Sequence, residues 1–190
     1  MRVKHLKQVL LASIAASFLT APAQAEPLEP TVVAEATKLI NNIRNKLDSC
    51  GEEGMLSNQG TQRVALAVTK PRPMLAWSPR LATIAQQHAK AMAEQNFFDH
   101  IDPQGRSVGQ RASESGYRWR VVGENLAAGH DSIGDAVRGW LLSTGHCKNL
   151  IDDRFTEFGI ARVQSNNPLD PYGSYWVMVA GRPQMSDPAK

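Results

Sequence analysis

The chain has 190 residues, of which 42% are hydrophobic and 21% charged, and a formal net charge of +3. Three of its 21 Lys and Arg residues lie within residues 1–25, which hold no Asp or Glu, so 18 basic and 18 acidic residues remain in the rest of the chain. A chain that is neutral beyond residue 25 gives no electrostatic reason to expect a nucleic-acid partner. Its length fits one domain with a core of ordinary size.

The first 25 residues have the layout of a secretory signal peptide. Basic residues precede a mostly apolar run over residues 9–19, and Ala23-Gln24-Ala25 supplies the small-x-small pattern of a cleavage site. The apolar run is much shorter than the roughly 20 residues that span a bilayer as a helix. We therefore expect cleavage after Ala25, a periplasmic or secreted protein, and no transmembrane segment afterwards. An uncleaved membrane anchor is the alternative.

The chain contains two cysteines, Cys50 and Cys147. An even number of cysteines in an exported chain favours a disulfide. Closing a loop of about a hundred residues would contribute roughly 4–5 kcal/mol in the chain-entropy model, before strain. Two buried free thiols are the alternative.

The first half of the chain predicts two amphipathic helices. Residues 26–30 are a lead-in punctuated by prolines, and residues 31–48 repeat apolar side chains at helical spacing. Residues 51–73 hold several helix breakers and predict a long loop, and residues 74–77 predict a short strand. Ser78 and Pro79 then start a second helix, which runs to about Gln95 and carries His88 on its apolar face.

The second half predicts shorter helices and most of the sheet. Ser107 and Gln110 fit a capping box that opens a short helix, and Ser132 caps another helix that ends at Ser143-Thr144-Gly145. The remaining segments are read as an extended stretch over 117–122, strands over 158–163 and 174–180, and a hairpin connection over 165–173. Helices flanking a small, largely antiparallel sheet make an α+β fold the economical interpretation.

Three polar residues stand next to apolar elements and are candidates for chemistry: His100, Glu124 and His146. Two imidazoles and one carboxylate can hold a divalent metal and leave coordination positions open. Alternatively, the carboxylate can orient one imidazole and raise its basicity for proton transfer. Spacing alone is a weak signal for either role, because no two of these residues sit at i, i+4 and the His-Glu-x-x-His motif is absent.

A series of motifs in fixed order strengthens this interpretation. In order, they are His88-Ala89-x-x-Met92 with Phe97-x-x-His100, Gly123-Glu124-Asn125, Trp140-x-x-Ser143-x-Gly145-His146-x-x-Asn149-Leu150, and Tyr175-Trp176-Val177. The series resembles the CAP superfamily (cysteine-rich secretory proteins, antigen 5 and pathogenesis-related 1), in its bacterial SCP-domain branch. The resemblance covers residues 35–182, which leaves 26–34 as an N-terminal lead-in and 183–190 as a C-terminal tail.

The resemblance implies a three-layer α-β-α sandwich with a cleft lined by two histidines and acidic residues. By that resemblance His100, Glu124 and His146 are the cleft residues, and His100 and His146 are the ligands of Zn²⁺ or another divalent cation. Where many eukaryotic members carry a second cleft glutamate, this chain has Ser143. The acidic half of the site is therefore reduced to Glu124, which weakens any general acid/base pair.

Other polar and aromatic residues have structural interpretations. The apolar helical face of His88 favours a core histidine, although it fits the first histidine of the family pattern. His130 matches no motif and is expected in an exposed loop, while Trp140 and Trp176 are expected in the core. Asn125 is expected to support its loop by hydrogen bonds.

Three functions fit the resemblance, because one fold hosts many functions. The first is a monomeric binding module of the cell envelope, whose His/Glu cleft holds a divalent cation. Its partner would be an unidentified envelope ligand, protein or lipid. The second is a metal-dependent hydrolase that uses His100, Glu124 and His146. The third is a carrier of lipid or a sterol-like ligand. The single cleft glutamate favours the first, and no long apolar groove is evident for the third.

Overall fold

A computed structural model describes residues 26–47, 49–50 and 72–184 of the chain. The described helices are α1 (Pro30–Lys46), α3 (Pro79–Gln95), α4 (Val108–Glu114), α5 (Ile133–Leu142) and α6 (Thr144–Ile151). The strands are β1 (Ala76–Trp77), β2 (Trp119–Ala128), β3 (Glu157–Gln164) and β4 (Ser174–Pro183). The expected signal peptide, nearly all of the expected loop over 51–73 and the end of the expected tail lie outside the described residues.

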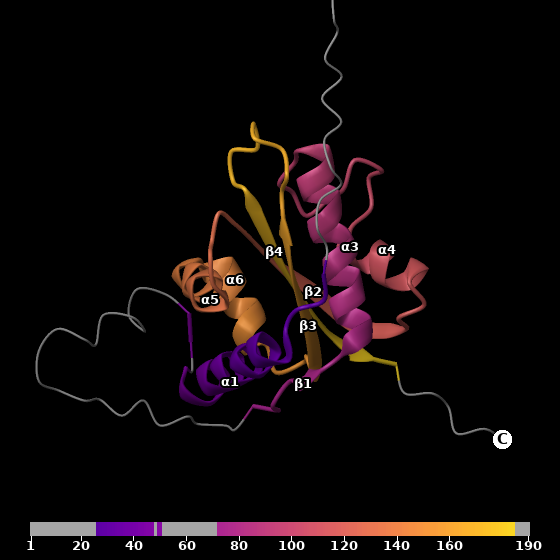
Figure 1. Cartoon of the computed structure of the whole chain (residues 1–190). Helices are drawn as coiled ribbons and strands as arrows, with labels where there is room; N and C mark the ends of the chain where they lie inside the picture. The colour runs from indigo at the N-terminus through magenta and orange to yellow at the C-terminus, as the bar shows by residue number, and fades with distance from the viewer. Residues whose placement is uncertain (1–25, 48, 51–71, 185–190) are drawn as a thin grey trace, which may run out of the picture.

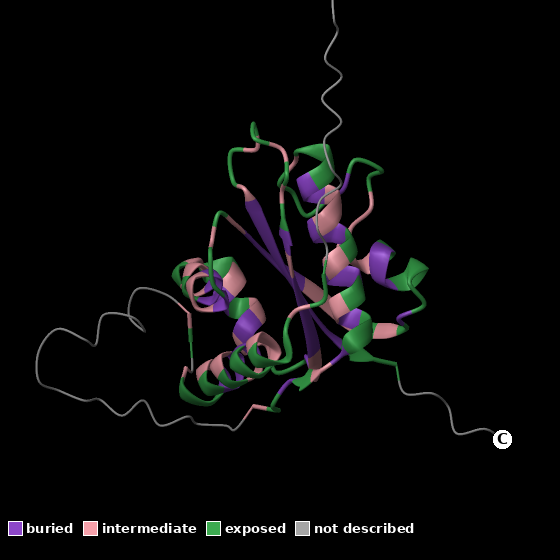
Figure 2. Ribbon diagram, viewed as in Figure 1, coloured by how far each residue is buried: buried purple, intermediate pink, exposed green. Residues whose placement is uncertain are grey.

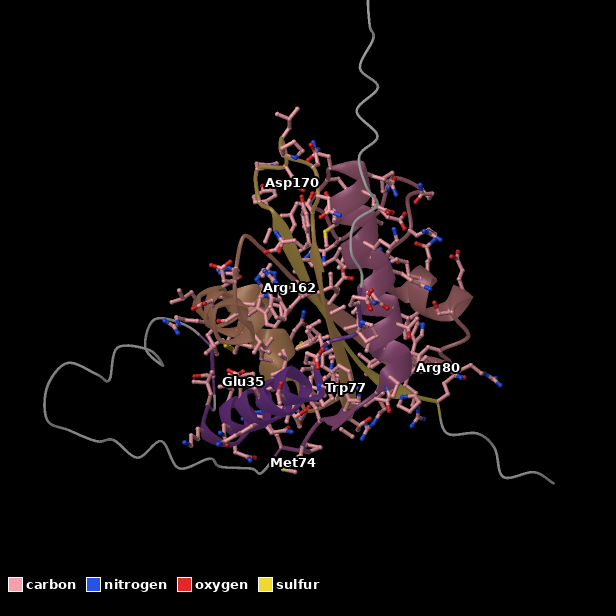
Figure 3. The ribbon with its side chains drawn as sticks, viewed as in Figure 1. Glu35, Met74, Trp77, Arg80, Arg162 and Asp170 are labelled. Carbon is pink, nitrogen blue, oxygen red and sulfur yellow. A yellow bond between two sulfur atoms is a disulfide. The ribbon has the colours of Figure 1, made fainter. Side chains whose placement is uncertain are left out.

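The strands form one sheet in the order β1-β3-β4-β2 (Figure 1). The pairs β2–β4 and β3–β4 are antiparallel, and only the short β1 pairs in parallel with β3. β3 and β4 are joined across residues 165–173, where the Ser165 amide donates to the Gly173 carbonyl at 2.8 Å. The tip of this hairpin carries Asp170 (Figure 3). The largely antiparallel sheet and its hairpin connection are therefore confirmed.

Helices cover both faces of the sheet, with α1, α5 and α6 on one side and α3 and α4 on the other (Figure 1). The central strand β4 is buried along most of its length (Figure 2) and alternates between the two cores. Trp176 and Met178 pack with α1, α5 and α6, whereas Val177 and Val179 pack with α3 and α4. The expected three-layer α-β-α sandwich is confirmed.

Local signals in the sequence explain where several helices begin. Ser107 and Gln110 form the expected capping box at α4, with each side chain bonded to the other residue's backbone N–H. The Ser132 hydroxyl accepts from the Asp135 amide at the start of α5. Pro79 occupies the first turn of α3, where the missing N–H costs no helical hydrogen bond.

The predicted helix stop is confirmed, because α5 ends at Leu142 and Ser143 has an extended backbone. The helix that follows was not predicted: Ser143 is also the N-cap of α6, so His146 lies in the first turns of that helix. One boundary near the expected site was wrong. The extended stretch continues past Val122 to Ala128, because residues 124 and 125 still pair with Val179 and Met178 of β4.

A disulfide joins Cys50 to Cys147, with the two Cα atoms 5.9 Å apart and 97 positions apart in sequence. The prediction of a disulfide is thus confirmed, and the bridge connects the end of α1 to α6. Arg44 adds a second connection, because its buried guanidinium donates to the carbonyls of Leu150 at 2.8 Å and Asp152 at 3.0 Å. The helix that carries His146 is therefore linked at its middle to the segment just after α1, and near its C-terminus to α1 itself.

Within the described ranges, no helix combines the length and the apolar character that crossing a bilayer requires.

Candidate functional site

Glu124 projects from the edge strand β2 toward the layer of α3 and α4, and its side chain is only 1% exposed. Its Oε1 atom lies 2.8 Å from Nδ1 of His100, and its Oε2 atom accepts from Nη2 of Arg111 at 2.6 Å. Both carboxylate oxygens are thus engaged by charged or ionisable partners. This satisfies a buried carboxylate, which would otherwise carry a large desolvation cost.

Arg111 is a residue of this site that the sequence did not reveal. From α4 its Nη1 atom donates to the carbonyls of His100 at 3.0 Å and Arg106 at 2.7 Å, while Nη2 binds Glu124. The signal that was available is its spacing: Arg111 stands three residues after Val108 and directly before the buried Ala112, so it belongs to the core face of a short helix. A charged side chain on the core face of a helix needs a buried partner of opposite charge.

The loop that carries His100 is held by its own side chains. The carboxylate of Asp99 accepts from the Ile101 amide at 2.8 Å, and that of Asp102 accepts from the Gln104 and Arg106 amides. These bonds give the loop an ordered backbone without regular secondary structure. The His100 ring, half exposed at 52%, is presented at the surface while its Nδ1 atom is fixed by Glu124.

His146 comes from α6, in the opposite helical layer, and its ring centroid lies 6.3 Å from that of His100, with the ring planes 47° apart. Its backbone is anchored to β2, because Nδ2 of Asn125 donates to the His146 carbonyl at 3.0 Å. Asn149 completes this support by donating to the Glu124 carbonyl and to Oδ1 of Asn125. The three expected residues therefore meet around the β2 edge of the sheet.

The two histidines have opposite pKa shifts. The hydrogen bond to Glu124 raises the pKa of His100 above its ordinary value of 6.5 and outweighs the effect of burial. Burial lowers the pKa of His146, and the nearby His100 lowers it further. At neutral pH the proton therefore favours His100, whereas His146 is neutral and has a lone pair to offer.

His88 lies behind these residues as a core histidine. Its side chain is fully buried, and its Nε2 atom lies 2.9 Å from the Asp99 carbonyl and 4.0 Å from Oε1 of Glu124. Burial lowers its pKa, which keeps the ring neutral. Trp140 and Trp176 are also buried, as expected, and their indole nitrogens donate to backbone carbonyls.

The donor atoms fit a metal ion only through the two imidazoles. Among the described residues, no three His, Cys, Asp or Glu side chains gather as a ligand set for one ion. Glu124 is committed to His100 and Arg111, so it matches the carboxylate that orients a ligating histidine rather than a ligand itself. His100 and His146, here called the histidine pair, would supply two nitrogen ligands, with solvent completing the coordination.

Comparisons with known proteins identify the family of the chain. The sequence model of the CAP (cysteine-rich secretory protein) family matches residues 37–180. YkwD, an uncharacterised protein of Bacillus subtilis, is 31% identical over 96 residues, which are 50% of this chain and 35% of that protein. The match to YkwD therefore spans about a third of that relative's length.

Two solved structures share the fold. An extracellular protein containing an SCP domain from Bacillus anthracis str. Ames has a TM-score of 0.53 and 26% identity, with 83% of this chain and 45% of that chain covered. An outer surface protein of Borrelia burgdorferi has a TM-score of 0.60 and 18% identity, with 83% of this chain and 97% of that chain covered. With a family match over most of its length and the same sandwich architecture, the chain belongs to the cysteine-rich secretory protein (CAP) family.

Proposed function

We propose that this chain is an exported binding module of the bacterial cell envelope whose histidine pair takes a divalent cation, with Zn²⁺ as the first candidate. The observation that carries the proposal is the 2.8 Å contact between Glu124 and Nδ1 of His100, beside the ring of His146. A carboxylate on one ring nitrogen fixes the tautomer and leaves the other nitrogen as the ligand.

The pKa shifts of His100 and His146 support cation binding that depends on pH. His146 has a lowered pKa and is ready to bind a cation at neutral pH, whereas His100 must give up a proton first. A bound divalent cation would supply positive charge that attracts or polarises a ligand. Glu124 stays on the far side of the His100 ring, where it holds the imidazole in one orientation.

The same contacts argue against a hydrolase that uses Glu124 as its general base. A general base must reach the proton that it abstracts, directly or through one water. The Glu124 carboxylate is buried, and both of its oxygens are occupied by His100 and Arg111. By the family resemblance, Ser143 stands where many eukaryotic members carry a second cleft glutamate. A binding role therefore suits this geometry better than acid/base catalysis.

One observation favours the lipid-carrier alternative. An apolar cavity of about 290 Å³ lies between α1 and the disulfide, lined by residues that include Leu39, Ile43 and Leu141. This volume is just below the roughly 300–1,000 Å³ found for small-molecule sites. It suits a short acyl chain better than a sterol. Mass spectrometry of an organic extract of the purified protein would reveal such a ligand, and an extract free of lipid would argue against it.

Export is supported by three independent features. The first 25 residues have the pattern of a signal peptide. The Cys50–Cys147 disulfide belongs to an oxidising compartment. The similar Bacillus anthracis protein is described as extracellular. These features support the proposal that the protein is exported, to the periplasm or out of the cell.

Calorimetric titration of the oxidised protein with ZnCl₂ at neutral pH tests the proposal. The wild type is expected to bind one ion saturably, and His100→Ala and His146→Ala are each expected to weaken binding by at least about tenfold. His130→Ala is the matched control. Because His130 lies outside the motifs that contain His100 and His146, this substitution should leave binding unchanged. Binding that survives in both variants, or no binding by the wild type, would overturn the metal site.

A further inference from the structure

Strand β3 has an outer edge that is paired over only part of its length. β1 pairs with Glu157 and Phe158, and the Ser78 amide then donates to the Phe158 carbonyl at 2.8 Å. Directly afterwards the chain leaves the sheet, because Pro79 begins α3. From residue 159 to residue 164, no described strand pairs with this side of β3.

The direction of the backbone groups on this edge follows from the alternation of a strand. The Phe158 carbonyl points to the β1 side, so the N–H and C=O groups of Arg162 and Gln164 point to the same side. Among the described residues, none of these groups has a hydrogen-bond partner. Arg162 is half-buried and Gln164 is exposed. An unpaired edge of this kind is a template for another extended chain.

The side chains of β3 define two faces at this edge. Ile160 belongs to the core of α1 and α5, whereas Ala161 and Val163 belong to the core of α3. A chain added beside β3 would alternate in the same way. Its residues opposite Arg162 and Gln164 would face the side of α1 and α5, and the residues between them would face α3.

The side of α1 and α5 offers negative charge. A cavity of about 410 Å³ lies there, and its lining includes Arg162, which Figure 3 shows between the two helical layers. The lining also includes four carboxylates from the segment before α1, from α1 itself and from the segment before α5: Glu26, Glu29, Glu35 and Asp131. Among the described residues, none of the four is in an ion pair. This surplus of negative charge is complementary to a basic side chain.

The side of α3 is nearly uncharged. A cavity of about 460 Å³ is lined there by residues that include Trp77, Ala82 and Thr83, and Glu26 is the charged residue of its lining. Residues 26–28 line both cavities, so this segment and α3 border the edge from two sides. An edge bordered in this way admits a single extended chain more readily than the sheet of a second copy.

We propose that the edge of β3 at Arg162 and Gln164 binds an extended segment of a partner protein, which adds to the sheet as a further strand. Main-chain hydrogen bonds would give affinity, and the two cavities would select a segment that alternates basic and apolar side chains. The edge lies at the opposite side of the sheet from β2, which carries Glu124. Binding of the segment is therefore independent of a cation at the histidine pair.

Fluorescence anisotropy of a labelled peptide in the presence of EDTA tests the proposal. The probe is acetyl-Lys-Val-Lys-Val-Lys-amide with fluorescein on a terminal linker, and its counterpart carries glutamate in place of lysine. The lysine peptide is expected to bind saturably, and the glutamate peptide at least about tenfold more weakly, because it meets the carboxylates.

Two N-methylated forms of the lysine peptide test the main-chain pairing. One form is methylated on the lysine amides and the other on the valine amides. Since alternate N–H groups of a strand face the same edge, only one set can donate to β3. One form should therefore lose at least about tenfold in affinity, and the other should bind like the unmodified peptide.

A pair of charge variants tests the acidic cavity. Glu29→Gln with Asp131→Asn removes two of its carboxylates and should weaken binding of the lysine peptide about tenfold. Glu94→Gln with Asp153→Asn is the control, because it changes the net charge equally at residues that line neither cavity. This control should bind the peptide like the wild type.

A second pair of variants tests the side of α3. Thr83 is an exposed residue of the lining, so Thr83→Trp would fill that side of the edge and should abolish binding. Gln87→Trp is the control, because Gln87 is exposed on the same helix but lines neither cavity. Circular dichroism of both variants checks that the fold is retained.

The proposal is overturned if the lysine peptide shows no saturable binding up to about 1 mM. Equal affinities of the two N-methylated forms would also overturn it, since charge alone would then attract the peptide. A wild-type dimer in sedimentation that excludes the peptide would overturn it in favour of a second copy at this edge. None of these results bears on Zn²⁺ binding, since EDTA removes the cation.

Discussion

Arg111 binds the carboxylate of Glu124 at 2.6 Å and, through the same guanidinium, the backbone carbonyl of His100 at 3.0 Å. His100 is consequently held at two points, its ring by Glu124 and its backbone by Arg111. A buried arginine of α4 thus fixes a histidine that is half exposed at the surface.

Replacing Arg111 should destabilise the whole domain. Arg111→Met leaves the Glu124 carboxylate buried without its cation, and breaking one side of a buried ion pair costs about 3–5 kcal/mol. Urea unfolding followed by circular dichroism measures the free energy of unfolding. The exposed Arg138, 3.7 Å from Asp135, provides the control Arg138→Met, which should change stability by less than about 0.5 kcal/mol. Equal stabilities for the two variants would contradict the role given to Arg111.

The pKa of His100 should depend on Glu124. Glu124→Gln removes the charged acceptor at Nδ1, so the pKa of His100 should fall toward its ordinary value of 6.5. His100→Ala should in turn raise the pKa of His146, because His100 contributes to its lowering. Imidazole chemical shifts measured against pH report both values. A pKa of His100 that does not move in Glu124→Gln would separate the two groups electrostatically.

The raised pKa of His100 also sets the pH dependence of stability and of cation binding. The pKa of His100 is higher in the folded state than in the unfolded state. The contact between protonated His100 and Glu124 therefore stabilises the fold fully below the unfolded-state pKa, and this contribution is lost as pH rises through the folded-state pKa. Zinc competes with the same proton, so its affinity should rise through that pH range. Calorimetry at several pH values measures it, and a pH-independent affinity would exclude His100 as a ligand.

Removal of the disulfide should weaken the fold. Cys50→Ser with Cys147→Ser releases a link between residues 97 positions apart and should cost about 2–5 kcal/mol. Thermal unfolding with and without dithiothreitol measures the effect, and the double variant should not respond to the reductant. Since Cys147 follows His146 in α6, Zn²⁺ affinity should fall as well. A variant as stable as the oxidised wild type would make the bridge dispensable.

Gly159 should tolerate no side chain. A Cβ atom there would overlap the backbone of Leu81 and Ala82 at the start of α3, because helix and strand approach closely. Gly159→Ala should cost about 3 kcal/mol or more, at or above the range for overpacked cores. Gly145→Ala is the matched control: no neighbouring atom lies within 4 Å of the added Cβ, so helix propensity should make it neutral or stabilising. Chemical unfolding compares the two, and a small loss at Gly159 would contradict the close approach.

Much of the fold followed from periodicity and caps. The alternating cores of β4, the capping box at Ser107 and the proline at the start of α3 are local patterns with local causes. The helix end at Ser143 was predicted correctly, but the helix that follows was not, because a single residue ends α5 and occupies the N-cap position of α6. A Ser-Thr-Gly sequence is typical of a helix end, and only the packing of α6 on the sheet determines that the helix resumes.

The candidate site was predictable in its histidines and glutamate but not in its geometry. His100 and Glu124 are 24 positions apart, and their contact depends on how α4 folds back between them. No spacing rule predicts that the guanidinium of Arg111 binds the Glu124 carboxylate. Nor does one predict that His100 and Arg111 occupy both Glu124 oxygens. Nor does spacing alone show that His146 approaches from the opposite helical layer.

Because the two histidines approach from opposite helical layers, a cation bound to both would link those layers. His100 belongs to the loop between α3 and α4, and His146 to α6 on the other side of the sheet. An ion bound by both rings would cross-link the two layers at the edge strand β2. The concentration of free cation around the cell would then set how firmly the two halves of the sandwich hold together, since binding to the folded state alone raises its stability with concentration.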